Sequence, residues 1–301
     1  MSPSNDTFAQ VAALVRRETS MVYDEGKEYL VQARLTPLAN AAGLSIDDYV
    51  RRLPVDPVER RKAVDALTIN ETSWFRDNSP YQVFTDDLLP AILAARTAQS
   101  ASAILPNRTI RIWSAACSSG QEAYSIAMLC EERLPDGWDY EIVATDISTE
   151  MVERVKAGRY SQVEVNRGLP ATRLISYFTR EGREWQVLER LRDRVHPRQM
   201  NLAAPYVGLG SFDLVLLRNV LIYFEPATKH DIVRRMLPMV APHGYLMLGS
   251  SETTLDFPPD LAAAWRREQF GRVQTHQRAD GVAVDRTAVP SLGARLTATG
   301  A

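Results

Sequence analysis

Residues 109–146, TIRIWSAACSSGQEAYSIAMLCEERLPDGWDYEIVATD, contain the pattern that decides the fold. The stretch begins with a short apolar run typical of a buried strand, and the small residues 115–120 then form a tight turn. Apolar residues recur at helical spacing over 123–130, and a second apolar run ends at Asp146. This order of strand, turn, helix and strand predicts one unit of a parallel α/β sheet.

The turn and the acid that follows it predict a ligand site. A parallel sheet binds ligands outside the carboxyl ends of its strands, where the strand order reverses. The small turn offers backbone N–H groups to a ligand. Asp146 follows the turn by about 20–26 residues, which is the spacing at which nucleoside-binding sites place an acceptor for the ribose hydroxyls. The stretch therefore indicates a nucleoside-cofactor site. Gly120 is the only glycine of the turn, so the G-x-G-x-x-G form is absent, and a plain βαβ unit with small packing residues remains the alternative.

Composition narrows the class of protein. The 301 residues suffice for two domains, and 45% apolar with 24% charged residues is ordinary for a globular chain. A net charge of -2 disfavours nucleic acid as the main partner.

The sequence also predicts where the protein is found. Residues 1–6 are polar and no long apolar run occurs, so neither a signal peptide nor a membrane span is expected, and the protein is expected to be cytoplasmic. Two cysteines cannot form a disulfide framework, and the four histidines lack metal-ligand spacing, so no metal is expected.

The chain divides into a helical part and an α/β part. Helical patterns over 8–72 predict an all-α N-terminal domain, whose scattered arginines form a solvated surface or a docking face for an acidic partner helix. Residues 73–108 are expected to form a linker helix and loop. Residues 109–277 form the cofactor-binding domain, in which 159–200 is an inserted subdomain, and 278–301 are expected to be a flexible tail.

Polar residues also stand where a ligand is expected. Arg218 and Asn219 follow an apolar strand, 212–217, at its carboxyl end. Arg76 lies beside large aromatic residues, which predicts either a cation–π pair at the surface or a guanidinium aimed at a carboxylate. A salt bridge with Asp77 is the simpler alternative for Arg76.

Four segments together resemble the bacterial chemotaxis receptor methyltransferases, the CheR family: 70–76, 114–125, 144–146 and 212–224. The resemblance covers residues 8–275. It implies an α/β fold, with a Rossmann-like sheet that binds S-adenosylmethionine (SAM), helices on both faces, a small inserted β-subdomain and an N-terminal all-α domain.

The resemblance also implies a function and a set of site residues. The family uses SAM to methylate glutamate side chains on the cytoplasmic domains of methyl-accepting chemotaxis receptors, with S-adenosylhomocysteine (SAH) as product. The positions that match its cofactor-contact residues are Asn70, Thr72, Arg76, Glu122, Asp146, Asn201, Leu202, Arg218 and Asn219. Arg76 and Tyr223 match the catalytic residues nearest the transferred methyl group. The expected partner is a receptor. This protein is expected to be a monomer that neither binds nucleic acid nor inserts into a membrane.

Two segments depart from the family pattern. Residues 120–125 read GQEAYS where the family usually reads GEEPYS, so Glu122 keeps the second acid and the first is neutral. The segment 179–200 is shorter than in members that grip a receptor's C-terminal pentapeptide, which counts against such tethering.

Other functions remain as alternatives. A non-catalytic adaptor of a receptor array would keep this fold, but the retained site residues count against it. An NAD-dependent oxidoreductase would also suit Asp146, but the glycine fingerprint and an acid–base group are missing. For Tyr223 the simpler alternative is packing against Phe224, and Glu122 also suits a helix N-terminus.

Overall fold

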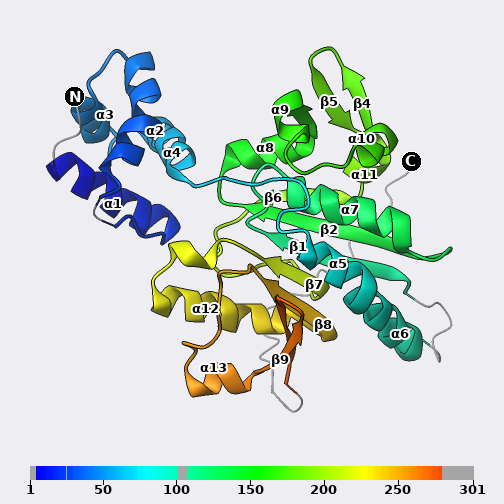
Figure 1. Cartoon of the computed structure of the whole chain (residues 1–301). Coiled ribbons are helices and arrows are strands. Elements are labelled where there is room, and N and C mark those ends of the chain that lie inside the picture. Colours follow the sequence, from blue (N-terminus) through cyan, green and yellow to red (C-terminus); the bar gives the residue numbers. More distant parts are fainter. Residues whose placement is uncertain (1–4, 25, 101–106, 280–301) are drawn as a thin grey trace, which may run out of the picture.

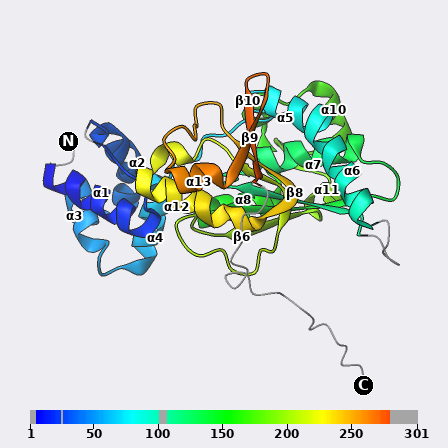
Figure 2. The same ribbon diagram turned by 90° about the horizontal axis from the view of Figure 1, so that it is seen from below.

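The computed structural model describes residues 5–24, 26–100 and 107–279, and shows a helical domain beside an α/β domain (Figure 1). Residues 280–301 of the predicted tail and residues 101–106 of the predicted loop lie outside the described residues. Seen from below, the helical domain lies at one end of the molecule, next to α12 (Pro226–Met236), and α6 (Leu89–Ser100) lies toward the other end (Figure 2). Within the described ranges, no helix combines the length and apolar character needed to cross a bilayer.

The predicted all-α domain is confirmed. It consists of α1 (Asn5–Thr19), α2 (Glu28–Ala41), α3 (Ile46–Arg52) and α4 (Pro57–Leu67). Polar residues begin two of these helices, because Ser45 accepts a hydrogen bond from the N–H of Asp48, and Asp56 accepts from two N–H groups of α4. Leu35 and Tyr49 are fully buried in the core between the helices.

The α/β domain is built on a seven-stranded sheet in the order β6-β2-β1-β7-β8-β10-β9. Its strands are β1 (Thr109–Ala115), β2 (Asp139–Asp146), β6 (Val195–Gln199), β7 (Phe212–Leu217), β8 (Val240–Leu248), β9 (Trp265–Phe270) and β10 (Val273–Arg278). The first five are parallel, and β10 and β9 add an antiparallel hairpin at one edge. The strand order reverses between β1 and β7, which is where such a sheet binds ligands.

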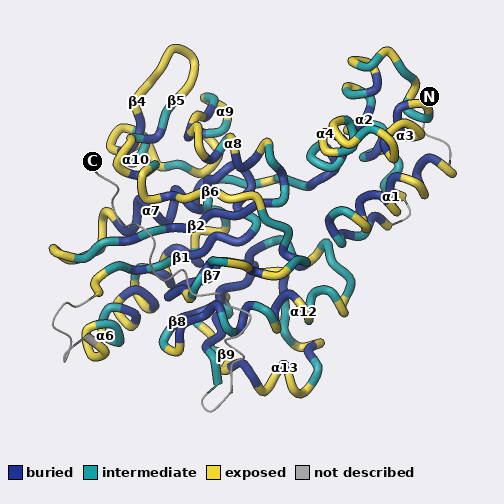
Figure 3. The backbone as a smooth tube through the Cα atoms, turned by 180° about the vertical axis from the view of Figure 1, so that it is seen from behind, coloured by how far each residue is buried: buried dark blue, intermediate teal, exposed yellow. Residues whose placement is uncertain are grey.

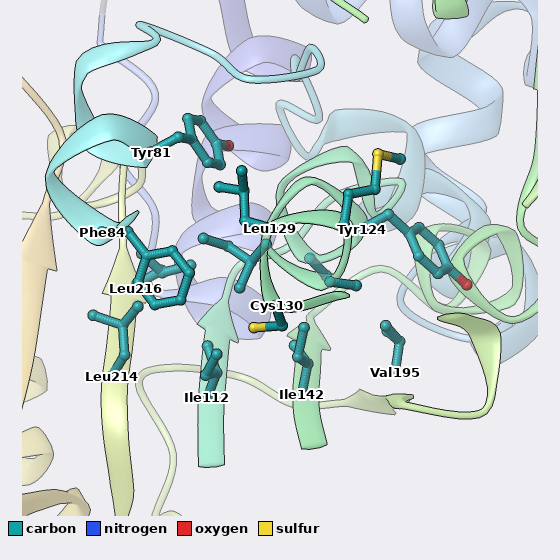
Figure 4. Packing of buried hydrophobic residues seen from close by; sticks show 14 of the residues in the cluster. Tyr81, Phe84, Ile112, Tyr124, Leu129, Cys130, Ile142, Val195, Leu214 and Leu216 are labelled. Carbon is teal, nitrogen blue, oxygen red and sulfur yellow. The ribbon is translucent and has the colours of Figure 1, made fainter. Parts of the chain in front are cut away.

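Side chains alternate between two buried layers, as they must on a strand with both faces covered. Ile112 and Leu214 point toward the layer that holds α7 (Gln121–Arg133), and the neighbouring Trp113 and Val215 belong to the opposite layer with α12 (Figure 4). The strands are accordingly dark, and the exposed residues lie on the outer elements (Figure 3). Helices on both faces of the sheet confirm the predicted α/β fold.

The segment expected as a linker is a layer of the α/β domain. Residues 79–100 form α5 (Ser79–Val83), a π-helical turn η1 (Phe84–Leu88) and α6. Phe84, Leu88 and Ile92 are fully buried in the same cluster as Leu214. Burial of these side chains against the sheet, which the local sequence does not reveal, makes this segment part of the domain.

The inserted subdomain is smaller than its predicted range, 159–200. It contains β3 (Arg159–Ser161), α9 (Gln162–Val165), α10 (Ala171–Tyr177), β4 (Phe178–Glu181), β5 (Glu184–Val187) and α11 (Glu189–Arg192). The three strands form a separate antiparallel sheet in the order β3-β5-β4. The last strand of the range, β6, instead pairs with β2 at the edge of the main sheet. The remaining helices of the domain are α8 (Thr149–Ala157), a 3₁₀ turn η3 (Leu237–Met239) and α13 (Pro259–Ala263).

A buried carboxylate ties α6 to the sheet. Asp213 at the start of β7 is fully buried and accepts hydrogen bonds from Arg96 at 2.8 and 2.7 Å and from the N–H of Arg111 at 2.8 Å. Nε2 of His243 lies 2.6 Å from Oδ1 of Asp213, the oxygen that also accepts from Nε of Arg96. Burial alone raises the pKa of Asp213, but the hydrogen bonds from His243 and Arg96 outweigh it, so the pKa lies below its ordinary value.

We expect Asp213→Asn to lower the free energy of unfolding by about 3–5 kcal/mol at neutral pH, because Arg96 then lacks its buried partner. A lowered folded-state pKa stabilises the protein above the unfolded value of about 3.9, and this contribution is lost as the pH falls. The difference from wild type, measured by urea unfolding, therefore shrinks below about pH 4. The exposed Asp136→Asn is the control. An equal difference at pH 3 and pH 7 would contradict the assignment.

Candidate active site

The turn after β1 adopts a backbone that few residues tolerate. Ala116, Ser118 and Gly120 have φ values of 63°, 49° and 96°. The left-handed conformation is unfavourable for residues other than glycine, and persists where the surroundings hold it. Here the N–H of Cys117 donates to the carbonyl of Thr145 at 2.9 Å. The small side chains of the turn leave its backbone close to the cleft, as the sequence predicts.

Asp146 lies at the carboxyl end of β2 and faces the same cleft. One carboxylate oxygen accepts from the N–H of Ser118 at 2.8 Å, and the other from the N–H of Ser148 at 2.9 Å. Burial raises the pKa of Asp146, and these backbone donors oppose the rise. A carboxylate has about four acceptor positions, so each oxygen can still accept from a ligand hydroxyl.

Arg218 and Glu122 form a buried ion pair below the cleft. The Arg218 side chain is 2% exposed, and its guanidinium lies 2.9 Å from Glu122 and 2.9 Å from Asp77. Burial lowers the pKa of Arg218, but the negative charge of Glu122 and other neighbouring groups raises it by more, so the net shift is upward. The second oxygen of Glu122 accepts from Ser114 at 2.8 Å. Asp77 therefore pairs with Arg218, and the alternative of an Arg76–Asp77 salt bridge is wrong.

Residues 69–78, here called the strap, lie between α4 and α5, and 69–73 and Arg76 line the cleft. The Ser118 hydroxyl donates to the carbonyl of Asn70 at 2.7 Å, and the N–H of Trp74 donates to the carbonyl of Arg167 at 3.1 Å. Arg76 donates one hydrogen bond, at 3.0 Å, to the carbonyl of Glu71. The rest of its guanidinium has no hydrogen-bond partner among the residues that the structure describes. It is therefore available to a ligand at the cleft.

Tyr223 lies in the 3₁₀ turn η2 (Leu221–Tyr223) that follows β7. Its carbonyl accepts from the N–H of Val22 at 2.9 Å, and the next residue, Phe224, forms a β-bridge with Met21. Both Tyr223 and Phe224 pack against the core of the helical domain. Burial raises the pKa of Tyr223, and the positive charge of Arg76, which also lines the cleft, opposes this rise.

Every residue predicted for the site lines one cleft. They are Asn70, Thr72, Arg76, Glu122, Asp146, Asn201, Leu202, Arg218, Asn219 and Tyr223. Thr19, Met21 and Thr68 line it as well, and no sequence pattern indicated this because the docking of the helical domain brings them there. Asn201 takes part in that docking, because its amide donates to the carbonyl of Glu18 at 3.1 Å.

A cleft at the switch point of a parallel sheet, with an acid after the second strand, defines a Rossmann-like enzyme that binds a nucleoside cofactor. Residues 70–263 match the family model of the CheR methyltransferase SAM-binding domain, and residues 6–68 match that of the CheR methyltransferase all-alpha domain. The chain belongs to the CheR methyltransferase family, and its cofactor is SAM.

Curated relatives match over most of their length. The chemotaxis protein methyltransferase Cher2 of Pseudomonas putida is 39% identical over 269 residues, which cover 86% of this chain and 94% of that protein. Chemotaxis protein methyltransferase 1 of Pseudomonas aeruginosa is 39% identical over 86% of this chain and 94% of its own. A chemotaxis protein methyltransferase of Vibrio parahaemolyticus is 38% identical over 83% of this chain and 90% of its own. These matches support SAM-dependent methylation in chemotaxis, and they support neither the oxidoreductase nor the adaptor alternative.

We expect Arg218→Met to lower the free energy of unfolding by about 3–5 kcal/mol, because it leaves Glu122 buried without its cation. The double variant Glu122→Gln/Arg218→Met is expected to regain part of this loss, since no buried charge then lacks a partner. Urea unfolding of the two variants measures the difference. A double variant less stable than Arg218→Met would contradict this expectation.

Proposed function

We propose that this protein transfers the methyl group of SAM to glutamate side chains on the cytoplasmic domains of chemotaxis receptors, and so forms methyl esters in the cytoplasm. The family match and the chemotaxis names of the relatives support the reaction class and the pathway. The observation that carries the acceptor is the partly unpaired guanidinium of Arg76 at the cleft beside Tyr223, because it can receive a carboxylate.

The residues of the cleft suit the two ends of SAM. When bound, SAM supplies an electrophilic methyl group. In the proposal, Asp146 accepts from the ribose hydroxyls, and Glu122 accepts from the ammonium of the methionine moiety, since both carboxylates keep acceptor positions after their internal hydrogen bonds. Asn201 and Leu202 hold the adenine. Asn70, Thr72, Arg218 and Asn219, which also line the cleft, complete the cofactor site in the proposal.

The acceptor needs no general base. A glutamate with a pKa of about 4.3 is already a carboxylate at neutral pH and is itself the nucleophile. No histidine occurs among the described residues that line the cleft, which agrees with this chemistry. The enzyme instead positions the reactants, which supplies up to about 7–11 kcal/mol. Arg76 orients one oxygen of the carboxylate toward the methyl carbon, and the Tyr223 hydroxyl donates to the same group.

We expect Asp146→Asn to raise the dissociation constants of SAM and SAH about 10- to 100-fold, because a charged acceptor for two hydroxyls is lost. Titration calorimetry measures both. Asp139→Asn is the matched control, because Asp139 lies at the opposite end of the same strand and pairs with Arg194. Affinity equal to wild type in a folded Asp146 variant would remove Asp146 from the ribose site.

We expect Arg76→Ala to lower the rate of methyl transfer at least about 100-fold while the SAH dissociation constant changes less than about 5-fold, because Arg76 acts on the acceptor. Transfer of radiolabelled methyl to receptor-bearing membranes measures the rate. Arg167→Ala is the control, because Arg167 also contacts Glu71, at 3.3 Å, but does not line the cleft. Unchanged turnover would exclude Arg76. If the wild-type protein binds SAH saturably but transfers no methyl group to the membranes, the result would favour a non-catalytic adaptor of a receptor array.

A further inference from the structure

Glu252, in the loop after β8, uses its whole carboxylate to hold backbone. It is 5% exposed and does not line the cleft. One oxygen accepts from the N–H groups of Val220 at 2.8 Å and Leu221 at 2.6 Å. The other accepts from those of Asn219 at 2.9 Å and Gly249 at 2.7 Å. Its four hydrogen-bond partners are therefore all main-chain donors.

Three of these donors are consecutive and lead into η2, which presents Tyr223. The first N–H groups of a helical turn have no partner within the turn, and an anion there satisfies them and complements their dipoles. Asn219 has a φ of 58°, an unfavourable backbone conformation that needs external support. Glu252, which does not line the cleft, supplies that support through its hydrogen bonds to 219–221.

Gly249 shows how closely this contact is fitted. A Cβ atom at Gly249 would lie 2.7 Å from the Glu252 carboxylate and 2.8 Å from the N–H nitrogen of Asn219. Both distances are far below van der Waals contact, and one of the two neighbours is backbone. An alanine at this position would therefore displace either the carboxylate or the loop that it holds.

We propose that Glu252 is a positioning residue for methyl transfer, whose carboxylate fixes residues 219–221 and thereby aims Tyr223 at the methyl acceptor. It touches neither the cofactor nor the acceptor and acts through the loop. The inference rests on the proposed function for its effect on turnover. Its structural part, the fixing of the loop, is independent of that function.

The experiment compares Glu252→Gln and Gly249→Ala, which disturb the same contact from opposite sides. In Glu252→Gln an NH₂ group faces two N–H donors in place of an acceptor. Glu268→Gln is the control, because it makes the same chemical change on β9, where Glu268 pairs with Arg266. The measurements are hydrogen exchange of residues 218–224, SAH affinity by calorimetry, and kcat and KM for methyl transfer to receptor-bearing membranes.

We expect both variants to exchange the amides of 219–221 at least about 10-fold faster, with exchange in β1 and β2 unchanged. The kcat value is expected to fall about 10- to 100-fold, since a displacement of about 1 Å at a reacting group costs that much. The SAH dissociation constant is expected to rise less than about 5-fold. A purely structural role would lower the unfolding temperature and leave kcat unchanged at 25 °C.

Three outcomes are decisive. Faster exchange confined to the loop together with reduced kcat supports the proposal. Exchange and kcat equal to those of Glu268→Gln overturn it, and so does faster loop exchange with normal kcat. If Glu252→Gln fails to fold, Gly249→Ala, which keeps the carboxylate, decides by the same criteria. Absence of methyl transfer by wild type would instead refute the proposed function, and the exchange data would still test whether Glu252 fixes the loop.

Discussion

The buried guanidinium of Arg218 joins the three elements that form the floor of the cleft. It extends from the end of β7, pairs with Glu122 on α7, and pairs with Asp77 and the carbonyl of Arg76 on the strap. Burying a charge costs several kcal/mol unless partners compensate for it. The planar guanidinium has five donors in a fixed arrangement, so one side chain can serve two carboxylates and a carbonyl. The positions of the strap, α7 and β7 are therefore mutually dependent.

The signs of charge in the cleft are arranged for the proposed reaction. Asp146, Glu122 and Arg76 all line the cleft, and the proposal assigns the two carboxylates to the cofactor and the cation to the acceptor. The sulfonium of SAM is positive and the acceptor carboxylate is negative, so each reactant meets the opposite charge. Methyl transfer removes both charges, because SAH is a neutral thioether at that atom and the ester is neutral. The contact of Arg76 weakens when the acceptor carboxylate becomes a neutral ester, which favours release of the methylated acceptor, whereas SAH keeps the ribose hydroxyls and the ammonium that Asp146 and Glu122 hold in the proposal.

The sequence was sufficient to predict those parts of the fold and the site that local patterns determine. The small turn at 115–120 and Asp146 predicted the cleft, because strand ends and tight turns are local features. It was insufficient where burial depends on distant partners. In β6 only Val195 is buried, and Pro197 interrupts the strand pattern, so this edge strand gave no apolar run. A helix was expected within 73–108, but the sheet against which Phe84, Leu88 and Ile92 pack could not be inferred.

The contribution of the helical domain to the site follows from the same reasoning. Thr19 and Met21 line the cleft, and Val22 donates to Tyr223 across the domain boundary. Arg16 also pairs with Glu225 at 2.7 Å, just beyond the turn. The loop that presents Tyr223 is thus held by Glu252 from within the α/β domain and by the α1–α2 connection from the helical domain. A loop held from two sides loses little further conformational entropy when the acceptor binds, and this pre-organisation is what a reaction without a general base requires.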